Sequence, residues 1–233
     1  MYLSYLIFIW GDIVIIKRLF LSLKEILIVM GIQYFIVIIS ILLLGYNSSI
    51  VWGTVFLMIF DIIYIVSKLK IIDVSFNIKN NYFPYMLLGI SISIIYNMIL
   101  YKFNLYQYSY VNLPFIVNIL ASGIIGPIFE EVLFRISFIN KLEKITSSKL
   151  LIIFVSSFIF AISHSNLFSI IIASILGVIN SYIFIKRKDA IKICLVHIFI
   201  NITSSFLYCY NSYILILGIA LLIISLLCFL SKK

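Results

Sequence analysis

The sequence predicts an all-α membrane protein, a polytopic bundle of about eight transmembrane helices. Of the 233 residues, 64% are hydrophobic and only 11% are charged, and the mean hydropathy is +1.25. Soluble domains are about half apolar and a quarter charged, so an ordinary soluble enzyme is excluded. The abundance of large apolar residues also excludes intrinsic disorder.

Apolar runs near the length that crosses a bilayer, about 20 residues, follow one another along the chain. They cover residues 1–16, 26–45, 50–67, 83–101, 115–139, 150–165, 167–185, 190–209 and 212–230. Because the first run is short, we expect it to be an interfacial or partial span, which leaves eight full ones. A signal peptide is disfavoured there, since no basic residue precedes the run and no small-residue cleavage site follows it. No linker divides the runs, so residues 1–233 are expected to form one integral membrane domain.

Basic residues gather in alternate connections between these runs. The clusters are Lys17, Arg18 and Lys24; Lys68, Lys70 and Lys79; Lys141, Lys144 and Lys149; and Lys186, Arg187, Lys188 and Lys192. The other connections carry only Lys102. The positive-inside rule places the basic connections in the cytoplasm, although Lys232 and Lys233 disagree, because the last run should end outside.

The distribution of charge and the spacing of the cysteines restrict the classes of molecule that the protein is expected to bind. The net charge of +9 is confined to short loops, which indicates contact with the headgroups of a lipid bilayer and not with nucleic acid. Cys194, Cys209 and Cys228 show no metal or disulfide spacing and are expected to be small buried hydrophobes. Abundant Ile, Asn, Lys and Tyr are typical of an AT-rich genome, so we expect a bacterial cytoplasmic membrane.

Four acidic residues fall inside apolar runs: Asp12, Asp61, Glu130 and Glu131. The first two lie within two turns of a lysine near the cytoplasmic end of a span, where pairing at headgroup level is expected. The other two lie deep in the 115–139 run, close to Arg135. Each charge near the bilayer centre costs roughly 2.5–3.5 kcal/mol on insertion scales, so three within six positions indicate a function.

Helix geometry separates the roles of these three charges. Glu131 and Arg135 are four residues apart and share a face, so we expect a structural ion pair. Glu130 is rotated by about 100° from Glu131 and is expected to face a polar cavity. A packing device of the kind found in a transporter core is the alternative for all three.

The only two histidines of the chain also lie in apolar runs. His164 stands near the end of its run, and His197 shares a helical face with Asn201, four residues later. A lone intramembrane histidine is often only an interhelical hydrogen-bonding residue. Together with a carboxylate, however, two imidazoles and an amide are what activation of a water and stabilisation of an oxyanion require.

Three motifs in order give the sequence a family resemblance. Glu130-Glu131-Val-Leu-Phe-Arg135, Phe160-Ala-Ile-Ser-His164 and His197-Ile-Phe-Ile-Asn201 resemble those of the CPBP family, the CAAX-protease and bacteriocin-processing proteins, also called Abi or type II CAAX prenyl endopeptidases. The resemblance covers about 123–202, inside a motif-bearing catalytic core that we place at 115–209. Ile136 stands where family members often carry glycine, which affects the expected helix packing there.

The resemblance implies an intramembrane endopeptidase that hydrolyses a membrane-associated peptide or protein. It assigns the general base to Glu130 with His164 as its partner, and the oxyanion hole to His197 and Asn201. Glu131 and Arg135 would be supporting residues. Counting at about 1.5 Å per residue, His164 lies one or two turns farther out than Glu130, so a tilt or a bend near Gly126-Pro127 is needed.

The family is often labelled a metalloprotease, and two histidines and two glutamates could ligate zinc. The sequence has no HExxH pair, and the guanidinium of Arg135 would stand beside the metal. We therefore expect no metal and no other cofactor, with zinc as the alternative.

Three functions compete. The first is maturation of a bacteriocin, a signalling peptide or another membrane-bound precursor by proteolysis. The second is self-immunity to a bacteriocin without required proteolysis. The third is a small transporter, which would be expected to show paired interrupted helices in two halves; none are evident in the sequence.

Overall fold

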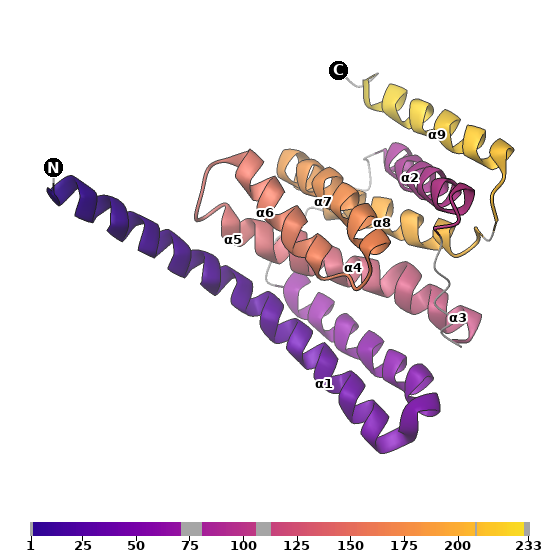
Figure 1. The fold of residues 1–233 in the computed structure, drawn as a ribbon, viewed down its shortest axis with the longest axis horizontal. Coiled ribbons are helices and arrows are strands. Elements are labelled where there is room, and N and C mark those ends of the chain that lie inside the picture. The colour runs from indigo at the N-terminus through magenta and orange to yellow at the C-terminus, as the bar shows by residue number, and fades with distance from the viewer. Residues whose placement is uncertain (1, 71–80, 106–112, 208, 231–233) are drawn as a thin grey trace.

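The described chain is helical throughout in the computed structural model (Figure 1). The structure describes residues 2–70, 81–105, 113–207 and 209–230, with side chains from residue 17 onward. These ranges contain helices and turns but no strand, which confirms the all-α class. Each predicted apolar run contains helix.

The first three apolar runs form a single hairpin. Helix α1 (Tyr2–Leu69) continues through all of them and bends at Gly45, where φ is 72° and ψ is 165°. Such a positive φ favours glycine, because a Cβ would crowd the following carbonyl oxygen. The two halves lie side by side (Figure 1), so closely that a Cβ at Gly53 would lie 3.3 Å from the Cβ of Ser40. The run 1–16 is therefore continuous with the helix that follows it.

Besides α1 and the helix that carries the first motif, the described chain has five further helices. They are α2 (Phe83–Lys102), α6 (Lys149–Ile162), α7 (Leu167–Arg187), α8 (Ala190–Ser204) and α9 (Ser212–Leu230). α2 packs between α8 and α9, and α6 forms a hairpin with α7. Side chains that accept a backbone N–H fix the starts of α6, α7 and α8, namely Ser148, Asn166 and Asp189.

The helix that carries the first motif changes its winding along its length. It consists of α3 (Phe115–Asn118), η1 (Ile119–Ile125), α4 (Gly126–Glu131), η2 (Val132–Ser137) and α5 (Phe138–Leu142), where η1 and η2 are π-helical. Its last two turns are the most buried part of the protein, since every residue of η2 is buried. π-helical turns inside longer helices occur frequently at functional sites.

The number of spans differs from the expectation. Five stretches of the described chain are long and apolar enough to cross a membrane: Lys17–Leu69, which contains the hairpin, Phe83–Lys102, Phe115–Leu142, Leu167–Arg187 and Ser212–Leu230. α6 and α8 have 14 and 15 residues, fewer than the roughly 20 that a span needs. Eight full spans are therefore not confirmed.

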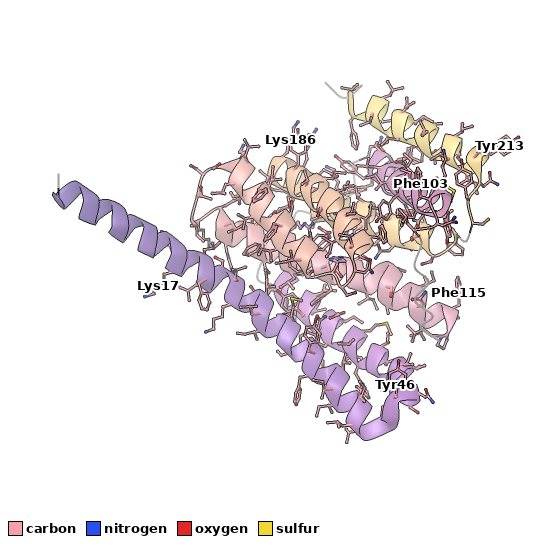
Figure 2. The ribbon with its side chains drawn as sticks, in the orientation of Figure 1. Lys17, Tyr46, Phe103, Phe115, Lys186 and Tyr213 are labelled. Carbon is pink, nitrogen blue, oxygen red and sulfur yellow. The ribbon has the colours of Figure 1, made fainter. Side chains whose placement is uncertain are left out.

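The basic connections lie together at one end of the bundle, as their alternation predicts. Glu25 forms ion pairs with Lys68 and with Lys141, the latter at 2.5 Å, and Lys188 pairs with Glu143 at 2.6 Å. Residues from the four basic connections thus meet there. Figure 2 shows Tyr46, Phe103, Phe115 and Tyr213, which lie in or next to the weakly charged connections, towards the opposite end from Lys186.

The expected pairing of Asp61 with Lys68 is wrong. Asp61 is buried and accepts a hydrogen bond of 2.8 Å from Gln33 Nε2 across the α1 hairpin, whereas Lys68 binds Glu25. The hairpin brings Gln33 and Glu25 next to the second half of α1. These contacts across the hairpin replace the expected contact between Asp61 and Lys68 along one helix. The side chain of Asp12 lies outside the described residues.

Candidate active site

A cavity of about 340 Å³ lies between α2, α4, α6, α7 and α8. Its volume is within the range of small-molecule and peptide sites, about 300–1,000 Å³. The four residues predicted to be catalytic all line it: Glu130, His164, His197 and Asn201. The two predicted supporting residues, Glu131 and Arg135, are completely buried behind it.

Glu131 connects two helices through its carboxylate. Its Oε2 lies 3.3 Å from Arg135 Nε, which is the ion pair that the four-residue spacing predicts. Its Oε1 lies 2.8 Å from His197 Nδ1, a contact across 66 positions that the sequence did not indicate. A carboxylate paired with a guanidinium accepts hydrogen bonds. The proton of this bond is therefore on Nδ1, and the Nε2 atom of His197 is left for the cavity.

Glu130 is the partly exposed member of the acidic pair, with 32% of its side chain accessible. Its Oε2 has no hydrogen-bond partner within the described chain and lies 3.7 Å from His197 Nε2. The expected direct partner, His164, does not form an ion pair or hydrogen bond with it in the described residues. Glu130 thus faces the cavity as predicted, but its nearest basic group is His197.

His164 lines the same cavity as Glu130. The expected difference of one or two turns in depth therefore does not separate the two side chains. Its Nδ1 lies 3.0 Å from the carbonyl oxygen of Phe160, one turn earlier. Because a carbonyl oxygen only accepts, Nδ1 is the donor and Nε2 carries the lone pair. Each of the two histidines is therefore held at Nδ1 and has Nε2 as its remaining reactive nitrogen.

The ring of Phe160 is the common packing surface of the site. It lies 5.0 Å from the His164 ring and 5.8 Å from the His197 ring, both edge to face. The guanidinium carbon of Arg135 lies over it at 4.0 Å, a cation–π contact. The sequence placed Phe160 in a motif without giving it a role, because these three neighbours come from different elements.

Asn201 is held by a carbonyl that the backbone leaves free. Its Nδ2 donates to the oxygen of Ser122 at 2.8 Å. In this π-helical stretch the Gly126 N–H bonds to Ala121, and the same five-residue step would lead from Ser122 to Pro127, which has no N–H. The Gly126-Pro127 pair thus creates the acceptor that orients Asn201. One N–H of the amide remains for a ligand.

The sequence did not indicate that α2 reaches the cavity. Ser93, Tyr96 and Asn97 line it from a helix that precedes the motifs. The spacing of Ser93 and Asn97, four residues apart in an otherwise apolar run, is the signal that could have placed them on one polar face.

The donor set does not fit a zinc ion. Among the described residues, no three histidine, cysteine, aspartate or glutamate side chains gather as possible ligands. Arg135 also lies 3.3 Å from Glu131, where its positive charge would oppose a second cation.

A protein-family model matches the region that contains this site. Residues 112–203 match the family model described as type II CAAX prenyl endopeptidase Rce1-like. This segment is Rce1-like. It contains all six predicted site residues, so the resemblance seen in the three motifs is confirmed. No curated protein and no solved structure matches the chain. The Rce1-like match implies a peptidase and, with the five apolar helical stretches, an integral membrane protein.

Removal of the buried guanidinium tests the ion pair. Arg135→Met should lower the free energy of unfolding by about 3–5 kcal/mol, because it leaves Glu131 as an uncompensated buried charge. The double variant with Glu131→Gln should recover part of this loss, since Gln still accepts from His197. Thermal unfolding in detergent measures both effects.

Arg187→Met is the matched control, because Arg187 is exposed at the end of α7. This variant should change the midpoint of thermal unfolding little. Equal losses for Arg135→Met and Arg187→Met would show that Arg135 does not hold the buried pair together.

Proposed function

We propose that the protein is an intramembrane endopeptidase that hydrolyses a peptide bond in a membrane-associated peptide or protein. The observation that carries this proposal is the single cavity lined by Glu130, His164, His197 and Asn201 within the Rce1-like segment. The Glu130 carboxylate, which has no hydrogen-bond partner within the described chain, the two histidine rings and the Asn201 amide all line this cavity of about 340 Å³.

Glu130 is the general base in this proposal. Its carboxylate takes a proton from a water as the water oxygen attacks the carbonyl carbon of the scissile bond, and His164 Nε2 holds the water in place. When the C–N bond of the tetrahedral intermediate breaks, the proton passes from Glu130 to the leaving amine. The partial exposure of the Glu130 side chain, 32%, at the wall of the cavity supports this role, because its carboxylate can be reached by water.

Asn201 and His197 stabilise the oxyanion. Asn201 donates one N–H of its side-chain amide to the Ser122 oxygen and donates the other to the developing negative charge. His197 holds its Nδ1 proton against Glu131, so Nε2 donates to the oxyanion when the ring carries both protons. Donors of this kind typically contribute a factor of about 10²–10³ in kcat each. Glu131 and Arg135 position His197 and do not contact the substrate.

The substrate that we propose is a precursor of a bacteriocin or of a signalling peptide, processed in a bacterial cytoplasmic membrane. The basic end of the bundle, which collects Lys68, Lys141 and Lys188, fits the cytoplasmic leaflet with its anionic lipids. The Rce1-like match and the apolar helices support a substrate that reaches the site from the membrane.

Glu130→Gln should abolish the cleavage while keeping the fold, since the amide has the same shape but cannot take the proton. Comparison of the small-peptide mass spectra of cells that carry the protein and cells that carry the variant should show a precursor that accumulates only with the variant. Identical spectra, with the variant folded and inserted, would contradict the protease and favour self-immunity or transport.

We further propose that the reaction uses no metal, which the guanidinium beside Glu131 supports. Cleavage of the accumulated precursor by the purified protein should therefore survive strong chelators without loss of rate. Activity that is lost with chelator and restored by zinc would contradict the mechanism through Glu130 and water.

A further inference from the structure

Helix α2 lies outside the Rce1-like segment but packs along the helix that carries His197 and Asn201. It supplies one wall of the cavity through Ser93, Tyr96 and Asn97. Its contacts with α8 are close and polar, formed by a small residue and by hydrogen bonds between the helices. They follow one another at a regular spacing.

Three successive turns of α2 meet three successive turns of α8. The pairs are Gly89 with Val196, Ser93 with Ile200 and Asn97 with Ser204. A Cβ at Gly89 would lie 2.4 Å from the carbonyl oxygen of Val196. Ser93 Oγ donates to the Ile200 oxygen at 2.9 Å, and Ser204 Oγ donates to Asn97 Oδ1 at 3.4 Å. Asn97 is fixed in turn by its Nδ2, which donates to the Ser93 oxygen at 2.8 Å.

These contacts fix α8 along its own axis. A packing of apolar side chains tolerates small sliding, whereas a hydrogen bond to a defined backbone oxygen does not. Val196 and Ile200 directly precede His197 and Asn201 in the chain. The position of α8 along α2 therefore sets the depth of both side chains relative to Glu130, which belongs to another helix.

We infer that α2 is a positioning element of the active site, and that Gly89 and Ser93 hold His197 and Asn201 at the depth where the oxyanion forms. The inference rests on the proposed function for its catalytic consequence. It extends the active site beyond the Rce1-like segment, to a helix that the motifs did not indicate. A displacement of about 1 Å at a reacting group can reduce the rate about 100-fold. The position of α8 along α2 therefore affects the rate of the reaction.

The chain offers a matched pair of variants. Ser91 and Ser93 are both buried on α2, but Ser91 Oγ donates to Leu88 of its own helix, whereas Ser93 Oγ donates to α8. Ser93→Ala should raise the rate of backbone hydrogen exchange in the peptide that covers α8 by about threefold to tenfold, the range expected for one interhelical hydrogen bond. Ser91→Ala should leave exchange in α8 unchanged. The full-length protein in lipid nanodiscs is used, and no substrate is needed.

The second measurement uses the precursor that accumulates with Glu130→Gln, prepared as a synthetic peptide. Ser93→Ala should lower kcat by about tenfold or more with KM within about twofold, because the oxyanion is misplaced while the cavity still binds substrate. Gly89→Ala should do the same, and Gly31→Ala, whose Cβ would meet nothing within 4 Å, should not.

The outcomes separate the two proposals. Equal hydrogen exchange in α8 for Ser91→Ala and Ser93→Ala would overturn the positioning role, whatever the enzyme does. Equal kcat for these two variants would do so as well. If Glu130→Gln retains full cleavage, the proposed mechanism fails, whereas the exchange measurement still decides whether α2 holds α8 in place.

Discussion

The carboxylate of Glu131, shared between Arg135 and His197, is the interaction on which the site depends. All three side chains are almost completely buried, with accessible fractions of 0% for Glu131 and Arg135 and 4% for His197. A buried charge is costly unless an opposite charge compensates it, and Glu131 compensates Arg135 at 3.3 Å. The pairing therefore forces the first-motif helix and α8 to meet at one point, and the face of Phe160 brings α6 to the same guanidinium.

The winding of the backbone and the contacts between helices position the other side chains of the site around the cavity. The rotation of about 100° between neighbouring residues of α4 places Glu131 inside and Glu130 at the cavity wall. Pro127 leaves the Ser122 oxygen without its backbone donor, and Asn201 takes the vacant place. α2 then sets the register of α8 through Ser93 and Gly89. His197 and Asn201 are thus both oriented by contacts to the helix that carries the first motif.

The parts that could be predicted from the sequence depend on local geometry. The Glu131–Arg135 pair follows from a four-residue spacing, and the exposure of Glu130 follows from its rotation on the same helix. The bend at Gly45 lies at the last residue of the apolar run 26–45, next to the connection that the hydropathy pattern predicts. Basic connections at one end of the bundle follow from the alternation of charge, because insertion selects that pattern.

The rest depends on contacts between residues far apart in the chain. The bond between Glu131 and His197, the reach of α2 into the cavity and the pairing of Asp61 with Gln33 all need the packed structure. Hydropathy alone also leaves the number of spans unconfirmed, because α6 and α8 are apolar but have only 14 and 15 residues.

The hydrogen bond between Glu131 and His197 can be measured directly, since the chain has only two histidines. Nitrogen-15 NMR of the histidine-labelled protein in detergent resolves both rings, and His164→Asn assigns them. We expect a protonated Nδ1 on His197 whose resonance moves in Glu131→Gln, while His164 keeps its own, because its Nδ1 is held by a backbone carbonyl. A His197 ring that is unaffected by Glu131→Gln would contradict the arrangement from which the catalytic roles follow.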